Sequence, residues 1–208
     1  MASSRSSPSR VLGRRASFWT AAAVAALALW TSGAPSVSYP LYAAEWHLTP
    51  TTTNAIFAVY PIVLVLVLVV LGDLSDHIGR RASIVLGLTA ILVGVLLFAV
   101  APHVGWVFVG RAFMGFGVGL SLSPASAAMV DFSRPDQVGR AGAVTTAATA
   151  TGLALATLVG GALVQYAPYP LHLDYVVLAV IVTGVLVLAW YLPRHVAVEA
   201  PPRGGSAA

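Results

Sequence analysis

Residues 61–81 read PIVLVLVLVVLGDLSDHIGRR, an unbroken apolar run that ends in a turn rich in glycine and charge. The run belongs to an apolar segment over residues 51–71, close to the roughly 20 residues that a helix needs to cross a bilayer. Only helices and closed barrels satisfy their backbone hydrogen bonds in lipid, and this segment is too long and continuous for a barrel strand. The stretch therefore predicts a transmembrane helix followed by a turn at the membrane surface.

Five further segments have the same length and character, so we expect an all-α fold, an integral membrane helical bundle of six transmembrane helices. The predicted spans cover residues 17–42, 51–71, 82–101, 105–130, 139–166 and 173–192. Residues 17–192 form the expected membrane domain. The flanking residues 1–16 and 193–208 are polar and rich in Ser, Pro, Gly or Arg, which predicts disordered tails.

The composition favours lipid as the solvent and excludes several kinds of chemistry. Hydrophobic residues make up 58% of the chain and charged residues 9%, which is more apolar surface than one soluble core can bury. The chain has no cysteine, which excludes disulfides and thiol nucleophiles, and no lysine, which excludes a Walker A phosphate loop. The histidines lack metal-ligand spacing, and the sequence contains no nucleophile elbow. We therefore expect neither an enzyme nor a bound metal or cofactor.

Arginines determine the expected orientation. Ten of them lie before the first predicted span or after the second, fourth and sixth, on one side of the membrane: Arg5, Arg10, Arg14, Arg15, Arg80, Arg81, Arg134, Arg140, Arg194 and Arg203. The loops of the other side contain no arginine and hold Glu45, His47, His103, His172 and Asp174. The positive-inside rule then places both termini in the cytoplasm, with the arginines near the headgroups of membrane lipids. Because the basic residues cluster at span ends rather than along one face, we expect no nucleic-acid partner.

The first predicted span has an alternative interpretation. Arg14 and Arg15 precede an apolar run with small residues at 31–36, a pattern that also fits a cleaved signal peptide. Cleavage would leave five spans and an amino terminus outside the cell, and the charge rule alone does not decide between the two. The run continues to about residue 42, longer than a signal core, which favours a retained helix.

The turn between the second and third predicted spans reads Gly72-Asp73-Leu74-Ser75-Asp76-His77-Ile78-Gly79-Arg80-Arg81. In order and in place it resembles the cytoplasmic loop motif of the major facilitator superfamily (MFS), with His77 where the family usually has a stronger base. The resemblance implies the amino-terminal six-helix half of an MFS transporter. It also implies a conformational latch formed by Gly72, Asp73, Asp76, Gly79, Arg80 and Arg81. In the family, the acid that matches Asp76 holds the two halves together on the cytoplasmic side.

Arg111 lies about two turns into the fourth predicted span, where a charge costs about 2.5 kcal/mol or more. Such a residue usually faces protein or a water-filled path, although an arginine at this depth can also extend to the outer interface. Arg111-Ala-Phe-Met-Gly115-Phe-Gly117 is similar to a fourth-span pattern of the same family. In proton-coupled members the matching arginine is linked to proton transfer, so the resemblance implies a coupling role for Arg111.

Glycines spaced four residues apart predict close helix packing. Gly115 and Gly119 share one face of the fourth span, and Gly152, Ala156 and Gly160 share a face of the fifth, followed by Gly161. The fifth span is partly similar to an antiporter pattern of the family, whose central Gly-Pro is Ala156-Thr157 here. The missing proline, and a first span without Asp or Glu, count against proton-driven drug efflux in particular.

Other polar or aromatic residues within the spans are candidates to line a solute cavity. The resemblance implies that the first, second, fourth and fifth spans surround it, and these spans hold Trp30, Asn54, Tyr60, Thr149 and Gln165. Each of these residues could equally serve as a contact between helices.

Six spans are half the usual number for this family, whose members pair two six-helix halves and bind solute between them. Three interpretations stay open: a half-size carrier acting as a homodimer or with a separate second half, an inactive fragment, and a membrane subunit that binds partners without transport. The first implies transport of a small solute by alternating access, with a proton as the default coupling ion. The solute itself is not specified by the fold.

Overall fold

The computed structural model describes residues 11–133 and 137–193, and within these ranges the fold is helical, without a strand. The helices are α1 (Arg14–Glu45), α2 (Pro50–Leu71), α3 (Leu74–Ile78), α4 (Arg80–Ala99), α5 (Val104–Asp131), α6 (Val138–Tyr166) and α7 (Pro170–Trp190). All but the short α3 are long and apolar enough to cross a membrane. The predicted all-α bundle of six membrane spans is therefore confirmed.

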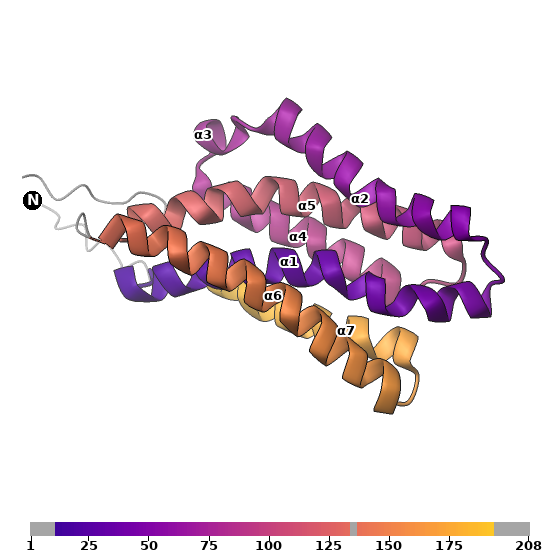
Figure 1. Ribbon diagram of the computed structural model, residues 1–208. Helices are drawn as coiled ribbons and strands as arrows, with labels where there is room; N and C mark the ends of the chain where they lie inside the picture. The colour runs from indigo at the N-terminus through magenta and orange to yellow at the C-terminus, as the bar shows by residue number, and fades with distance from the viewer. Residues whose placement is uncertain (1–10, 134–136, 194–208) are drawn as a thin grey trace, which may run out of the picture.

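The six long helices run side by side, with α2 along one edge of the bundle and α6 and α7 along the other (Figure 1). The most extensive helix contacts join α4 to α5, α1 to α6 and α2 to α5. Only 11% of the apolar part of α2 and 17% of that of α6 are buried, against 67% for α1. The helices α2 and α6 therefore keep most of their surface free.

Local sequence signals explain where two of the helices begin. The side-chain oxygen of Thr49 accepts a hydrogen bond from the backbone N–H of Thr52 (3.3 Å), and Pro50 occupies the first position of α2. Pro170 likewise begins α7, after Tyr169 in the left-handed region at φ 55°. A proline at the first helical position costs no hydrogen bond, because its missing N–H would have no partner within the helix.

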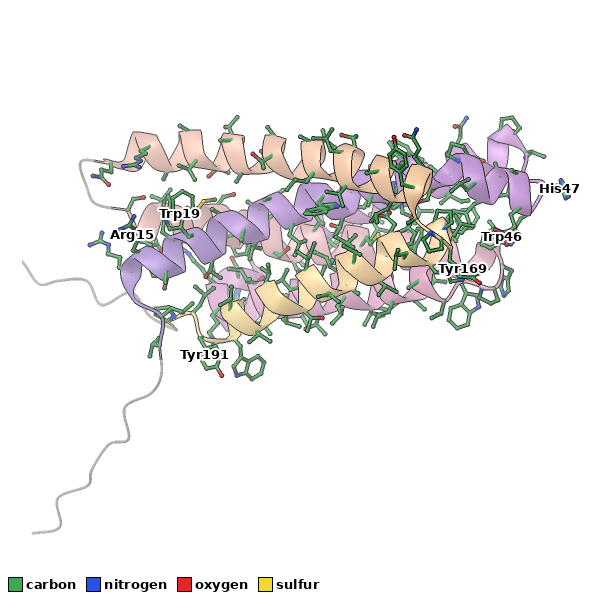
Figure 2. The ribbon with its side chains drawn as sticks, turned by 90° about the horizontal axis from the view of Figure 1, so that it is seen from below. Arg15, Trp19, Trp46, His47, Tyr169 and Tyr191 are labelled. Carbon is green, nitrogen blue, oxygen red and sulfur yellow. The ribbon has the colours of Figure 1, made fainter. Side chains whose placement is uncertain are left out.

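Aromatic side chains lie at both ends of the bundle. Trp19 and Tyr191 lie at the end that carries Arg15, and Trp46 and Tyr169 lie at the opposite end with His47 (Figure 2). Rings with one polar edge favour the headgroup region of a bilayer. The two groups therefore lie where the two membrane surfaces are expected.

Three local features differ from the prediction. α1 begins at Arg14 rather than residue 17, and Leu12 donates its N–H to the carbonyl of Tyr191 (3.0 Å), so residues 11–16 are not a disordered tail. The turn after α2 contains the unpredicted helix α3, which is too short to show an apolar pattern. Asp174, predicted with the outer loops, lies inside α7 and is 2% exposed, because Pro170 starts the helix ahead of it. The other predicted tail residues, 1–10 and 194–208, lie outside the described residues.

Candidate functional site

Arg111 is a cation enclosed by the bundle. Its side chain projects from α5 and has no exposed surface. Its Nη1 donates a hydrogen bond to the carbonyl oxygen of Ser32 in α1 (3.1 Å). A guanidinium has five N–H donors, so most of its hydrogen-bonding capacity is left after this bond. Arg111 therefore lies in protein rather than extending to the outer interface.

Three aromatic rings from α1 and α2 surround the guanidinium. Its central carbon lies 5.1 Å from the ring centre of Tyr60, 5.5 Å from that of Tyr39 and 5.8 Å from that of Phe57. At these distances the ring faces attract a cation, by about 0.5–2 kcal/mol each. Nε and Nη2 are buried and have no hydrogen-bond partner among the described residues. We call Arg111, Tyr39, Phe57 and Tyr60 the aromatic box, and its two unpaired donors make it the candidate solute site.

Five further residues were predicted to line a cavity, and of these Tyr60 lies beside Arg111. Trp30 is buried in α1. Thr149 donates its hydroxyl to carbonyls of its own helix, at 3.1 and 2.9 Å. Asn54 and Gln165 are exposed on α2 and α6.

Tyr39 and Phe57 complete the aromatic box and were not predicted. They are 72 and 54 positions before Arg111 in the sequence, and no motif links either of them to it. The available signal was the presence of an aromatic residue inside an apolar span. That signal alone does not indicate which way the ring points.

The loop motif forms a compact corner around α3. Gly79 joins α3 to α4 with φ 88°, a conformation that residues with a side chain rarely adopt. Nδ1 of His77 lies 2.9 Å from the carbonyl oxygen of Asp73, and Gly72 ends α2. Asp76 is exposed in the first turn of α3. Its carboxylate is therefore accessible to a partner outside this bundle.

The two arginines of the motif contact different helices. Arg80 forms an ion pair with Asp131 at the end of α5. The guanidinium of Arg81 lies 5.7 Å from the ring centre of Trp190 in α7. Together these contacts connect the start of α4 to the ends of α5 and α7. Asp131 and Trp190 were not predicted as partners, because each is distant in sequence from the motif.

We expect the ion pair of Arg80 and Asp131 to contribute little to folding. Their side chains are 41% and 33% exposed, and pairs in contact with water contribute about 0–1 kcal/mol. A double-mutant cycle with Arg80→Ala and Asp131→Ala, measured by unfolding in mixed detergent micelles, should give a coupling free energy below about 1 kcal/mol. A coupling well above this value would show that the pair is shielded from water.

The small-residue face of α5 lies against α2. A methyl group on Gly115 would lie 2.5 Å from the carbonyl oxygen of Tyr60, and one on Gly119 would lie 2.7 Å from Val67. Such distances are too short for real contacts, so both positions require glycine. This close approach also places Tyr60 against the part of α5 that carries Arg111.

The small-residue face of α6 lies against α1. A methyl group on Gly152 would overlap the carbonyl oxygen of Ala26, and one on Gly160 would lie 3.6 Å from Val37. Gly161, predicted with this group, would meet no heavy atom within 4 Å in the described part of the chain. It lies about 100° around the helix from Gly160 and so points away from α1.

Four glycines whose packing role was not predicted lie in the contact between α4 and α5, which we call the glycine seam. A methyl group on Gly94 would lie 2.7 Å from the carbonyl oxygen of Gly110, and one on Gly87 would lie 2.6 Å from that of Gly117. In each helix the two glycines are seven residues apart, which is two helical turns on one face. This spacing was the available sequence signal.

Comparison with known proteins agrees with this architecture. Residues 12–207 match the family model of the Major Facilitator Superfamily. The chain is 31% identical over 154 residues to the multidrug efflux pump LfrA of Mycolicibacterium smegmatis, which covers 71% of this chain and 30% of the pump. It is 33% identical over 89 residues to the facilitated trehalose transporter Tret1 of Culex quinquefasciatus, over 43% of this chain and 17% of that protein. A crystal structure of the peptide transporter POT with alafosfalin shares the fold, with a TM-score of 0.70 and 23% identity, over 83% of this chain and 36% of that one.

Six helices of this chain are long and apolar enough to cross a membrane, and the relatives named above are transporters rather than enzymes. The chain belongs to the Major Facilitator Superfamily. The family resemblance seen in the loop motif is thereby confirmed. The chain spans between 17% and 36% of the length of the three proteins above.

Proposed function

We propose that this chain is one six-helix half of a secondary carrier that moves a small solute across the cell membrane. Both termini face the cytoplasm, and a proton gradient drives the transport. Family membership supports transport by alternating access, and the arginine distribution supports the orientation. The solute binds between this half and a second half, on the side where the aromatic box lies.

The observation that carries the proposal is the buried guanidinium of Arg111. Arg111 has no acidic partner within residues 11–133 and 137–193. The ion pair found in these ranges joins Arg80 to Asp131 instead. An enclosed charge without a counter-ion is costly and usually marks a functional site in a membrane protein. A carboxylate, phosphate or carbonyl group of a solute would accept hydrogen bonds from Nε and Nη2. We therefore expect the solute to carry such an acceptor.

We propose that a second copy of this chain supplies the second half and covers α2 and α6. These are the long helices with the smallest buried share. Small side chains dominate the exposed face of α6, and small residues are typical of helix–helix contacts in membranes. The exposed residues include Ala143, Thr146, Ala147, Ala150, Thr151 and Ala154.

In such a dimer, Asp76 of one copy should approach Gly139 near the start of α6 in the other, since this is where the family resemblance places the partner of the latch acid. Both positions are exposed, and the chain has no cysteine of its own. We expect Asp76→Cys combined with Gly139→Cys to give a disulfide-linked dimer when membranes are oxidised. The reaction requires the two Cα atoms to come within about 7 Å. Gel electrophoresis without reductant measures the dimer.

The control pair is Asp76→Cys with Val11→Cys. Val11 is 48% exposed and lies next to Leu12, which is bonded to the end of α7, so it is at the same end of the bundle. Dimer formation no greater than in the control pair would contradict a second copy in this arrangement. The mass of the detergent-solubilised protein by light scattering would then distinguish a monomer from a differently arranged dimer.

Transport itself is tested with purified protein in proteoliposomes under an imposed pH gradient. The first solutes to try are drugs that bear a carbonyl, carboxylate or phosphate group, with trehalose, which has none of these groups, as the comparison. This choice follows from the relatives named above, a multidrug efflux pump and a trehalose transporter. At least one acceptor-bearing solute should move faster than in liposomes without protein. If no solute of the panel moves faster into vesicles that contain the dimer than into liposomes without protein, the proposal is contradicted.

A further inference from the structure

Asp174 is a buried carboxylate in the contact between α1, α6 and α7. It is the fifth residue of α7 and is 2% exposed. A methyl group on Gly160 of α6 would lie 3.6 Å from Asp174 Oδ1 and 3.6 Å from Val37 of α1. The carboxylate therefore lies between α7 and α6, close to Gly160, with Val37 of α1 beside the same glycine.

The carboxylate of Asp174 lacks the partners that stabilise a buried negative charge. Its Oδ2 is inaccessible to water and has no hydrogen-bond partner in the described ranges. Among these residues, no cation forms an ion pair with Asp174. The acid that pairs with an arginine there is Asp131. An ionised carboxylate in this environment is costly, whereas a carboxyl group that has bound a proton is neutral and can donate a hydrogen bond.

Buried hydroxyls lie beside Asp174 and lead toward the aromatic box. Tyr175 is its neighbour in α7, and Ser38 and Tyr39 follow Val37 in α1. The hydroxyls of all three are buried; that of Tyr175 lies near Ser38 and that of Tyr39 near Arg111, but none meets hydrogen-bond geometry with a partner among residues 11–133 and 137–193. The ring of Tyr39 lies 5.5 Å from the guanidinium of Arg111. These unpaired oxygens are the groups that ordered water would bridge.

The helices packed around this cluster bring mainly uncharged aromatic side chains to it. α1 contributes Tyr39 and Tyr42, and α7 contributes Tyr175, while Glu45 and His172 near the ends of these helices are exposed. α4 contributes Phe98, whose ring lies 4.8 Å from that of Tyr175 and 6.3 Å from that of Tyr42. α6 contributes Gly160, and α5 contributes Arg111 beyond Tyr39. Asp174 is therefore the buried acid of the cluster, and Arg111 is its buried cation.

We propose that Asp174 is a proton-binding site within the membrane, and that Ser38, Tyr39 and Tyr175 with bound water connect it to Arg111. One proton binds to a carboxylate oxygen of Asp174 and leaves from the same atom. The link of this proton to solute movement rests on the proposed function, whereas proton binding itself is a property of this chain alone.

Infrared difference spectroscopy of the purified protein in lipid tests the binding directly. A protonated carboxyl group has a carbonyl stretch distinct from those of ionised carboxylates and amides. We expect such a band at mildly acidic pH, where exposed carboxyl groups are still ionised, and we expect it to shift when the protein carries isotope-labelled aspartate. The band should be lost in Asp174→Asn and kept in Glu45→Gln, which removes an exposed carboxyl group from the same end of the bundle. If Asp174→Asn does not fold, the labelled wild-type protein still tests whether an aspartic acid band is present.

Absence of a labelled aspartic acid band at mildly acidic pH would overturn the proposal. An aspartate carboxylate signal that responds to sodium ions instead of pH would also overturn it, since the site would then hold a metal cation. A band that persists in Asp174→Asn would assign the proton to another aspartate and overturn it equally. Because none of these spectra requires transport, they separate failure of this site from failure of the proposed carrier function.

The transport assay then tests coupling. In proteoliposomes, Asp174→Asn should abolish solute accumulation driven by a pH gradient while solute exchange without a gradient continues. Glu45→Gln should keep both activities. Gradient-driven accumulation by Asp174→Asn at the wild-type rate would overturn the role of Asp174 in coupling.

Discussion

Arg111→Met should lower solute flux in proteoliposomes by at least about a hundredfold while leaving the bundle folded. Hydrogen bonds to a charged group contribute about 1.5–3 kcal/mol each. Nε and Nη2 of Arg111 are both unpaired and buried, so a bound solute can receive two such bonds. Losing both costs about 3–6 kcal/mol, and every 1.4 kcal/mol corresponds to about a tenfold change in affinity.

The effect of Arg111→Met on folding should be small because two terms oppose each other. The variant loses the hydrogen bond to Ser32 and the attraction of the aromatic rings. It also removes an enclosed charge, which costs about 2.5 kcal/mol or more in a membrane. We expect the free energy of unfolding, measured in mixed micelles, to change by less than about 2 kcal/mol.

Two variants separate the charge of Arg111 from its shape. Arg111→Lys keeps a charge but loses the planar fork of donors, so partial flux is expected. Arg140→Met removes an exposed arginine from α6 and should keep most of the flux. Full flux in Arg111→Met would show that the aromatic box is a structural contact, and severe unfolding of that variant would support the same conclusion.

The membrane helices were predictable because their signal is local. A continuous apolar run of about 20 residues with charged ends indicates a span without knowledge of its neighbours. The loop motif was likewise recognisable, because its glycines and charges are adjacent in sequence. These features depend on the bilayer and the backbone rather than on which helices meet.

Most contacts of the candidate site depend on helix packing and could not be predicted. Arg111 stood out because a charge is rare inside a span, yet Tyr39 and Phe57 had no such distinction. Asp174 was grouped with the outer loops although it is the second residue of the predicted sixth span, because hydropathy defines the end of a span poorly. Its burial follows from contacts with α1 and α6, which the sequence of α7 alone does not reveal.

The glycine seam connects these observations to stability. Gly87, Gly94, Gly110 and Gly117 allow the backbones of α4 and α5 to approach closely, and α5 carries Arg111. Lipid provides no hydrophobic force that joins helices, so close packing of small residues is a main source of association. The seam therefore fixes the position of α5, and with it the position of the guanidinium.

Gly117→Ala should lower the free energy of unfolding by about 2–3 kcal/mol, the upper part of the usual cost of overpacking. The added methyl group would lie 2.8 Å from the backbone nitrogen of Ile91 and against the carbonyl oxygen of Gly87. Neither backbone atom can rotate away, so α4 and α5 must separate. Unfolding in mixed micelles, followed by circular dichroism, measures the change.

The matched control is Gly184→Ala in α7, where an added methyl group would meet no heavy atom within 4 Å in the described part of the chain. Alanine is favoured over glycine in helices by up to about 1 kcal/mol, so this variant should be as stable as the wild type or more so. The same chemical change is thus expected to act in opposite directions at two positions. Equal effects at positions 117 and 184 would contradict close packing at the seam. Destabilisation confined to Gly117→Ala would show that contact between the backbones of α4 and α5 holds this bundle together.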